Sequence, residues 1–462
     1  MEFLQAIGNA ILSFNDWLNG ILWGPFMLIM IVGVGLYFTI RLKGIQFTQF
    51  GRACREIWNK IRFVDEKDKG DISPFKALTT AIASTVGVGN IAGVATAIAL
   101  GGPGAIFWMW VTGVLGMVTN YAEVTLGVHY REFRGGVVAG GPMYYIKNGL
   151  KWPWMAVVFS IFGAFAALGI GNMVQANSMA DVLNSTFGMP HLWTGIILAV
   201  LVGIVTLGGI KRIANVCGTL VPVMAIFYIL AASIIIIINI KAVPSAFALI
   251  FEYAFRPMSA VGGFTGATLM MTLRWGVARG VFSNEAGLGS TPIAHSTAKV
   301  DHPVRQGVWG LFEVFTDTII LCTMTALAII TTGVWTSGVT GASLTAMAFN
   351  AGLPNVGGLL VSIGVILFAY STTIVWCYYG EKCAEYLFGT KIVVPYRIIW
   401  LPFLFVGALG GLKMVWDIAD TLNALMAIPN LVALVLLSGV IVKLTKEFFT
   451  TEEFKEIKTK VK

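Results

Sequence analysis

Apolar residues follow one another along most of this chain in long blocks, and short polar segments separate the blocks. About 20 helical residues cross the roughly 30 Å of hydrocarbon in a bilayer, and eleven blocks approach or exceed that length. They lie near residues 22–40, 74–100, 103–128, 153–187, 191–210, 213–240, 262–297, 306–335, 356–380, 395–412 and 418–442. The pattern predicts an all-α polytopic membrane protein with eleven transmembrane helices.

The second block is interrupted by the run Thr-Val-Gly-Val-Gly-Asn at residues 85–90. Each glycine weakens a helix by about 1 kcal/mol relative to alanine, and unwinding inside a membrane leaves backbone groups that hydrocarbon cannot satisfy. We therefore expect something polar to be bound at this point. The alternative is that Gly87 and Gly89 only let a neighbouring helix pack closely, as small residues often do in membranes.

The seventh block carries a second interruption, at residues 278–292, where glycines and polar residues are frequent. A charge such as Glu285 costs at least about 2.5–3.5 kcal/mol in a bilayer, so this segment is not predicted to be one plain helix. Its break, expected near Ser283, follows the break near Gly87 by slightly more than half of the region 74–442. Interrupted helices at matching places in two halves are typical of inverted-repeat transporters with a site at the midplane.

The two interruptions predict a five-plus-five inverted repeat with two broken helices, to which the first span is an addition. The predicted organisation has an N-terminal lead-in, first span and basic loop at 1–73, and a first repeat at 74–240. A second repeat follows at 241–442, and a basic tail at 443–462. Five spans in each repeat require that the two halves have opposite orientations in the membrane.

Lysine and arginine are distributed very unevenly among the loops, and such residues favour the cytoplasmic side of a membrane. One set of loops holds only Lys241, Arg256 and Lys413, whereas the alternate loops and the tail hold nearly all the others. We predict a multi-pass protein of the cell membrane with its N-terminus outside and its C-terminus in the cytoplasm. No basic region precedes the first block, so a cleaved secretory signal is not expected.

Composition agrees with a membrane protein and explains the charge of the chain. Hydrophobic residues make up 57% and charged residues 12%, with a mean hydropathy of +0.81, values that fit no soluble domain. The net charge of +8 is accounted for by loops that face an anionic cytoplasmic leaflet, so no nucleic-acid partner is expected. The cysteines and histidines lack the spacing of disulfide, zinc or metalloenzyme sites.

Several long segments resemble the hallmark motifs of the alanine or glycine:cation symporter family. They are residues 85–93, 101–113, 171–177, 282–287, and 368–373 with Trp376 and 378–381. The likeness covers nearly the whole chain and keeps the expected order. It implies sodium-coupled import of alanine or glycine on a leucine-transporter-type fold. Residues 86–90 are also similar to the unwound first core helix of the neurotransmitter:sodium symporters.

The resemblance implies where a zwitterionic amino acid would bind, and each role agrees with the chemistry. The start of a half-helix near Gly89 presents N–H groups and a positive dipole end, which favour an anion. The substrate carboxylate is therefore expected at Gly87, Val88 and Gly89. The groups expected to face the ammonium are carbonyls near Thr85 and from Gly280 to Ser283, assisted by Asn284.

Two further features are expected to complete the substrate site. Asn172 and Gln175 are candidates for the ammonium because residues three apart share a helix face; the alternative is that they only bond neighbouring helices. Phe282 and Trp376 are expected to limit the substrate side chain, since overpacking costs about 1–3 kcal/mol, although aromatic rings more often serve packing alone. The predicted substrate is a small neutral amino acid.

The co-transported sodium ion is a hard cation that needs five or six oxygen ligands, and carbonyls freed by unwinding plus hydroxyls supply them. By the same resemblance, the expected ligands are the carbonyls of Ala83 and Val86 and the hydroxyls of Ser371 and Thr372. A second site is expected near Asn90 and Thr85. The alternative for the two hydroxyls is a bond to a carbonyl one turn earlier in their own helix.

Acidic residues within or near the predicted spans leave proton coupling open. They are Glu123, Asp181, Glu285, Glu313, Asp317 and Glu381. Structural pairing, with Arg274 and Arg279 as partners or gates, is the preferred interpretation, and a proton-coupled transporter of the same fold is the main alternative. A channel would not need a closed amino-acid-shaped site. An enzyme would need a nucleophile and base near Ser283, where the sequence has no paired histidine or nucleophile elbow.

Overall fold

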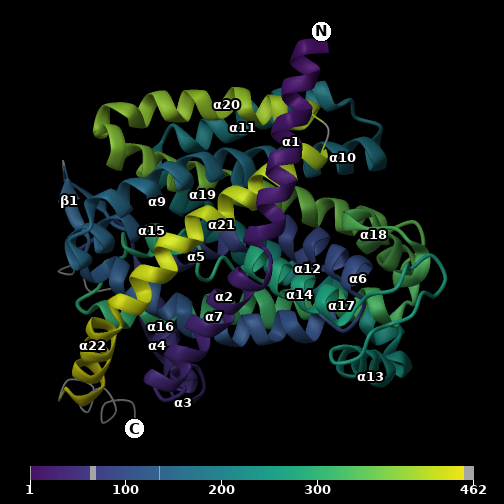
Figure 1. Ribbon diagram of the computed structural model, residues 1–462, viewed down its shortest axis with the longest axis horizontal. Coiled ribbons are helices and arrows are strands. Elements are labelled where there is room, and N and C mark those ends of the chain that lie inside the picture. The colour runs from purple at the N-terminus through teal and green to yellow at the C-terminus, as the bar shows by residue number, and fades with distance from the viewer. Residues whose placement is uncertain (1, 63–68, 135, 411, 452–462) are drawn as a thin grey trace.

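The computed structural model describes residues 2–62, 69–134, 136–410 and 412–451, and the end of the predicted basic tail, 452–462, lies outside them. Nearly all of the described chain is helical (Figure 1). The all-α expectation is wrong at one place, where β1 (Glu132–Arg134) and β2 (Val137–Ala139) pair as a short antiparallel hairpin.

The first half of the described chain contains the predicted first span and first repeat. Its helices are α1 (Glu2–Leu22), α2 (Pro25–Arg41), α3 (Ile45–Thr48), α4 (Phe50–Arg62), α5 (Pro74–Thr85), η1 (Gly89–Gly93), α6 (Val94–Gly101), α7 (Ala105–His129), α8 (Pro142–Tyr145), η2 (Ile146–Leu150), α9 (Pro153–Ala166), η3 (Ala167–Val174), α10 (Gln175–Phe187), α11 (His191–Thr206) and α12 (Gly209–Ile238). Segments η1, η2 and η3 are π-helical.

The second half contains the predicted second repeat and the start of the tail. Its helices are η4 (Ile240–Ala242), α13 (Val243–Tyr253), α14 (Leu269–Asn284), α15 (Thr291–His295), α16 (Pro303–Val314), η5 (Phe315–Cys322), α17 (Thr323–Thr331), η6 (Val334–Ser337), α18 (Gly341–Gly352), α19 (Gly357–Phe388), η7 (Thr390–Ile392), α20 (Val393–Leu409), α21 (Leu412–Leu436) and α22 (Ser438–Thr450). Segment η5 is π-helical, whereas η4, η6 and η7 are 3-10 helices.

Length and composition identify seven helices of the described chain that could each cross a membrane, and up to nine if each of two bent pairs is one span. The two pairs are α1 with α2, bent by 40°, and α5 with η1 and α6, bent by 46°. α11 is apolar but has only 16 residues. The chain is therefore a mostly helical polytopic membrane protein.

The bend after α5 coincides with the predicted unwinding at residues 85–90. α5 begins with Pro74 after Ser73, whose hydroxyl accepts a hydrogen bond from the N–H of Lys76, as favoured at a helix start. The last bond of α5 runs from the N–H of Val86 to Ile82. The half-helix that starts at Gly89 then leaves at a new angle.

The second interruption lies beyond the predicted position. The prediction that the helix opens between Gly280 and Ser283 is wrong, because α14 continues through Asn284. The N–H of Glu285 still bonds the carbonyl of Val281, and Glu285 itself takes a left-handed conformation with φ 57°, which ends a helix. The irregular stretch therefore begins at Glu285 and lasts until α15.

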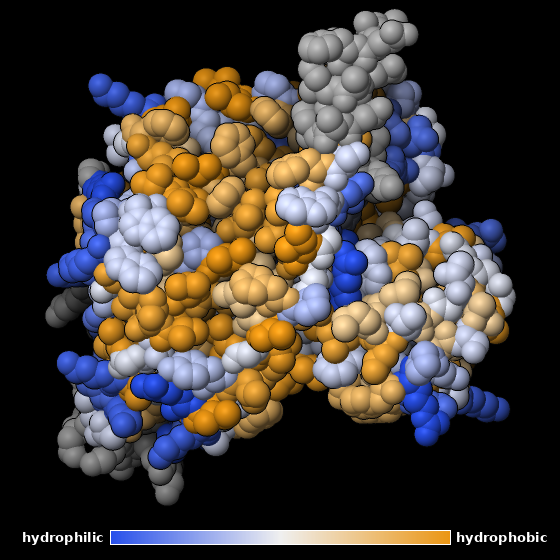
Figure 2. Space-filling view, in the orientation of Figure 1, coloured by the Kyte–Doolittle hydropathy of each residue, from blue (hydrophilic) through white to orange (hydrophobic). Residues whose placement is uncertain are grey.

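The exterior of the helices agrees with a lipid environment. Large hydrophobic side chains of α11, α12 and α20 are exposed, including Ile204, Ile226 and Ile398. Hydrophobic side chains cover much of the face shown in Figure 2, and hydrophilic ones gather toward its left and right margins. Loops and short helices occupy those margins in Figure 1, where the β hairpin and α22 lie on one side and α13 and α18 on the other.

Candidate functional site

The break after α5 frees backbone carbonyls, and the hydroxyl of Thr372 on α19 lies among them. The N–H of Gly87 bonds Asn90 Oδ1 at 2.9 Å, so it does not close a helical bond to the carbonyl of Ala83. Thr372 Oγ1 lies 3.0 Å from that carbonyl oxygen and 3.5 Å from the carbonyl oxygen of Val86. The carbonyls of Ser84 and Phe368 are also within 3.3 Å of this hydroxyl.

One hydroxyl hydrogen can serve only one acceptor at a time, so this group is rich in oxygen and poor in donors. Three of the four expected sodium ligands, Ala83, Val86 and Thr372, are brought together here. The neighbouring Ser371 differs, because its hydroxyl bonds the carbonyl of Phe368 in its own helix at 2.9 Å and contacts Met224 Sδ. Ser371 therefore follows the alternative of a bond within its own helix.

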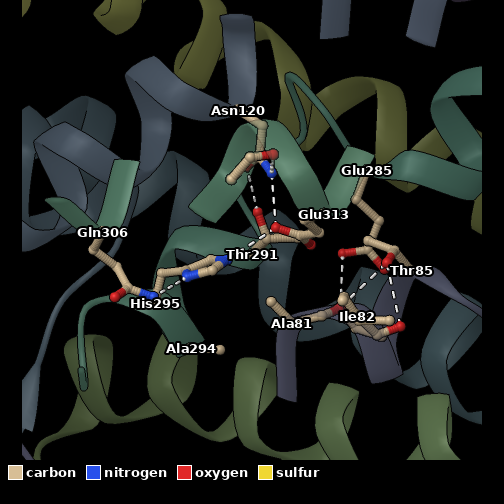
Figure 3. Close-up of polar contacts among 12 residues, drawn as sticks. Ala81, Ile82, Thr85, Asn120, Glu285, Thr291, Ala294, His295, Gln306 and Glu313 are labelled. Atoms are coloured by element: carbon tan, nitrogen blue, oxygen red, sulfur yellow. Dashed lines mark hydrogen bonds and ion pairs between the residues drawn. The ribbon is translucent and has the colours of Figure 1, made fainter. Parts of the chain in front are cut away.

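Thr85 and Asn90, expected at a second cation site, do not share one. The hydroxyl of Thr85 bonds the carbonyls of Ala81 and Ile82 within α5 (Figure 3). The amide of Asn90 accepts from Gly87 and donates to the carboxylate of Asp317 at 2.6 Å. The side chain of Asn90 therefore binds the carboxylate of Asp317 on η5, whereas the hydroxyl of Thr85 bonds only its own helix.

One of the three N–H groups expected to bind the substrate carboxylate already has an acceptor in the protein. Val88 and Gly89 lie at the start of the half-helix η1, where N–H groups have no acceptor inside the helix. The N–H of Gly87, in contrast, is already bonded to Asn90. A Cβ at Gly89 would lie 3.2 Å from Phe282 Cδ1, so only glycine allows this close approach without displacing the ring.

The two amides of the fourth span face different partners. Gln175 Oε1 lies 3.6 Å from where a Cβ of Gly87 would be, is buried, and has no hydrogen-bond partner among the described residues. Gln175 Nε2 donates to the carbonyl of Ile170 at 3.1 Å, whereas Asn172 Nδ2 donates to the carbonyl of Trp400 on α20 at 2.8 Å. Asn172 Oδ1 also has no partner in the described part of the chain. The expectation that they share one face is wrong because η3 is π-helical. A π-helix has more residues per turn than an α-helix, so side chains three residues apart no longer lie on the same face.

The two aromatic residues expected to limit the substrate side chain lie near the two breaks. Phe282 lies beside Gly89 and stacks on Trp416 with a centroid distance of 5.1 Å. Trp376 is buried, and its Nε1 donates to Glu285 at 2.9 Å. The backbone of Gly171 approaches Trp376 so closely that an added Cβ would lie 2.0 Å from the Cβ of the tryptophan.

Ser283 and Asn284, at the end of α14, are both bonded to η5. The hydroxyl of Ser283 donates to Asp317 at 2.9 Å, and Asn284 Nδ2 donates to the hydroxyl of Thr318 at 3.1 Å. Asp317 also accepts from Asn90, so its carboxylate joins the ends of both broken spans. The carbonyl of Gly280 stays inside α14 and is not released.

Comparison with known proteins identifies the family of the chain. The model of the sodium:alanine symporter family matches residues 8–462. The chain belongs to this family. It is 50% identical to the sodium/alanine symporter AgcS of Methanococcus maripaludis over 97% of this chain and 98% of that protein. It is 38% identical to the amino-acid carrier protein AlsT of Bacillus subtilis, over 94% and 92% of the two chains.

The fold of this sodium:alanine symporter family member is that of leucine-transporter-type proteins. The crystal structure of MhsT in complex with L-phenylalanine matches 80% of this chain and 89% of MhsT, with a TM-score of 0.57 and 14% identity. At that identity the likeness concerns the fold alone. The family membership agrees with a transporter and not with an enzyme.

The acids within the spans of this protein have partners that the sequence pattern alone does not reveal. Three of the six acids contact a basic residue: Glu381 contacts Arg397, Glu313 contacts His295, and exposed Asp181 contacts His191. None of the six pairs with Arg274 or Arg279 in the described part of the chain, so that part of the expectation is wrong. The charge partner of Arg279 is Asp420, a residue that no motif of the sequence singles out. The sequence identifies Asp317 only as an acid within a span. Its position between the ends of the two broken spans depends on contacts between helices that are distant in the chain.

Glu285 and Glu313 belong to two neighbouring groups of buried polar side chains around the second break (Figure 3). Glu285 accepts from Trp376 and from Ser290. Glu313 accepts from Asn120 at 2.8 Å and contacts His295 at 2.9 Å. These contacts hold the irregular stretch between α14 and α15 against α7, α16 and α19.

Proposed function

We propose that this protein imports small neutral amino acids, alanine and glycine, together with sodium by alternating access. The observation that carries the proposal is the oxygen group around Thr372, in which carbonyls from the α5 break meet a hydroxyl of α19. Such a group suits a hard monovalent cation because it supplies oxygen ligands without a fixed negative charge. Each positive charge carried inward gains about 2.3 kcal/mol per 100 mV of membrane potential.

The substrate class is supported by complementary groups beside this cation site. The N–H groups of Val88 and Gly89 suit a carboxylate, and the unpartnered Gln175 Oε1 suits an ammonium. Phe282 lies against Gly89 of the same half-helix, and in this proposal its ring, with that of Trp376, limits the substrate side chain to a small one. The name of AgcS, a sodium/alanine symporter, agrees with this choice.

We also propose eleven spans with the N-terminus outside and the C-terminus in the cytoplasm. The nine candidate spans become eleven if short α11 and the interrupted pair α14–α15 are counted. The five-plus-five repeat would then run from α5 to α12 and from α14 to α21. The alternation of basic loops supports the orientation.

The decisive experiment uses the purified protein in liposomes with an inward sodium gradient. Labelled alanine should accumulate, and replacing sodium by potassium should abolish accumulation. Thr372→Val should lower uptake at subsaturating sodium by about tenfold, the effect of losing about 1.4 kcal/mol of cation binding. Thr372→Ser should retain most of the uptake.

The matched control is Thr373→Val. The hydroxyl of Thr373 is equally buried but bonds only the carbonyl of Ala369 in its own helix. Equal losses in Thr372→Val and Thr373→Val would contradict a cation site at Thr372. Accumulation that persists without sodium would contradict sodium coupling altogether.

A proton-coupled transporter of the same fold is the second candidate, and Asp317 is the observation that favours it. Its carboxylate is fully buried, joins both broken spans, and forms no salt bridge with a basic residue in the described part of the chain. A proton gradient without sodium would then drive alanine uptake, and Asp317→Asn would abolish it.

A further inference from the structure

Arg279 packs against Phe282 on α14 and against Trp416 on α21. It lies one helical turn before Phe282 on α14, and its guanidinium stacks over the rings of Phe282, Trp275 and Trp416 at 5.2–5.5 Å. One guanidinium nitrogen binds Asp420 on α21 at 2.9 Å. We call Arg279, Phe282, Trp416 and Asp420 the outer gate, because they join α14 to α21 above Gly89.

The turn of α21 that carries Asp420 is bonded to the additional first span. Trp23 Nε1, just after α1, donates to the carbonyl of Asp420 at 3.0 Å. Asn19 Nδ2 on α1 donates to the carbonyl of Asp417 and to the hydroxyl of Thr421, both at 3.2 Å. Three hydrogen bonds, two from α1 and one from the residue just after it, therefore attach this end of the first span to the turn whose carboxylate binds Arg279.

A cavity of about 350 Å³ lies beside the outer gate, and α1 forms one of its walls. α1 supplies Asp16, Asn19 and Gly20 to the lining, and the gate residues Arg279 and Asp420 also line the cavity. In the proposed topology this cavity opens to the outside. It is polar and carries both signs of charge, as a path for a zwitterion requires.

We propose that the additional first span positions the outer gate, with Asn19 and Trp23 fixing the turn of α21 so that Asp420 meets Arg279. The inference deepens the proposed function and rests on it, since a gate matters only if substrate passes through. Asn19 and Trp23 are positioning residues: they act on the substrate through Asp420 and do not contact it. In this proposal α1 contributes to transport, because the five-plus-five repeat alone does not supply the hydrogen bonds that position Asp420.

The test compares Trp23→Phe, which keeps an aromatic ring and removes only the N–H donor, with Trp17→Phe as the control. Trp17 lies on the same helix but is 61% exposed. In liposomes, Trp23→Phe should raise the KM for alanine about fivefold, the effect of one lost hydrogen bond, whereas Trp17→Phe should leave it unchanged. Asn19→Leu should act in the same direction as Trp23→Phe.

A double-mutant cycle separates positioning from general destabilisation. If Trp23 acts through Asp420, Trp23→Phe should add little to the KM of Asp420→Asn. Fully additive effects on KM, or an equal effect of Trp17→Phe, would overturn the proposal.

A second measurement does not depend on which amino acid is carried. Cys322 is buried and contacts Asn90 and Ser283, the residue that follows Phe282 of the gate. In a variant that retains only this cysteine, a membrane-impermeant thiol reagent should label it several times faster after Trp23→Phe than after Trp17→Phe. Equal labelling rates would overturn the gate role. Faster labelling in a protein that fails to accumulate alanine would instead reject the proposed substrate while keeping the gate.

Discussion

Adjacent residues of identical chemistry have different fates in this protein, and the difference arises from the direction of each side chain. Ser371 and Thr372 both carry hydroxyls and both are buried in α19. Ser371 bonds its own helix, whereas Thr372 also reaches the carbonyls freed by the α5 break. At this scale a polar side chain is informative when its partner lies on another element or is missing.

Gln175 is such a residue, because its buried Oε1 lacks a partner among the described residues. Gln175→Leu keeps the size and removes the acceptor, so we expect alanine affinity to fall by about tenfold or more, as for a hydrogen bond to a charged group. Equilibrium binding of labelled alanine to the purified protein measures this. Asn177→Leu is the matched control, since Asn177 Oδ1 also has no partner in the described chain while its Nδ2 donates to the carbonyls of Gly407 and Gly410 at the end of α20. It should lower thermal stability without this loss of affinity, and equal losses of affinity would refute the assignment.

At the scale of the elements, the site lies where helices are broken or π-helical. The breaks after α5 and α14 release backbone groups, and η3 and η5 rotate the side chains that follow them relative to an ordinary helix. Close approach of η3 to α19 requires Gly171 opposite Trp376. The geometry of the site therefore depends on how near these elements can come to each other.

Gly171→Ala tests that dependence. The added Cβ would lie 2.0 Å from the Cβ of Trp376, so η3 must move away from α19. We expect a loss of about 1–3 kcal/mol in stability, the usual effect of overpacking, seen as a lower midpoint in thermal unfolding of the detergent-solubilised protein. Gly33→Ala, in α2, is the control because no atom lies within 4 Å of the new Cβ. An unchanged midpoint in Gly171→Ala would show that the helices can separate freely.

At the scale of the whole molecule, a strip of hydrogen bonds links the two broken spans on the side opposite the outer gate. The segment before α5 pairs with the segment after α15, through bonds from Asp71 N–H to Thr297 and from Lys299 N–H to Ile72. Arg131, at the end of α7, donates to the carbonyls of Ser296, Ala298 and Lys69. This strip must part if the site opens to the cytoplasm in the proposed cycle.

Arg131→Lys should loosen the strip, because an ammonium cannot reproduce the planar fork that spans several carbonyls. We expect amide hydrogens of residues 69–73 and 296–299 to exchange about tenfold faster, measured by hydrogen–deuterium exchange with mass spectrometry. This corresponds to losing one bond to a charged donor. Arg256→Lys provides the comparison, since the side chain of Arg256 is 73% exposed. Unchanged exchange in both variants would exclude Arg131 as the clamp.

The proposed orientation of the whole molecule is tested by single cysteines in a cysteine-free background. Trp17→Cys should react with a membrane-impermeant thiol reagent in intact cells. Thr451→Cys should react only after the membrane is permeabilised. Both side chains are exposed, so burial does not limit labelling. The opposite result would invert the topology and place the outer gate in the cytoplasm.

The sequence by itself determined the membrane environment, the family and the existence of two interruptions. These depend on local properties: the length of apolar runs, the cost of glycine in a helix and the cost of polar groups in hydrocarbon. The break at residues 85–90 was predicted correctly because two glycines mark it. The second was misplaced because the end of α14 is set by the left-handed Glu285, whose side chain bonds Trp376 and Ser290.

Only the tertiary structure decided which polar side chains face one another. Helical spacing assigned Asn172 and Gln175 to one face, but the π-helical η3 separated them. Helical spacing also gives no reason to choose Thr372 over Ser371 as a cation ligand, or to single out Asp317 and Asp420 among the acids. Those assignments depend on contacts between helices far apart in the chain, and on how closely glycines let them approach, which a pattern along one helix does not contain.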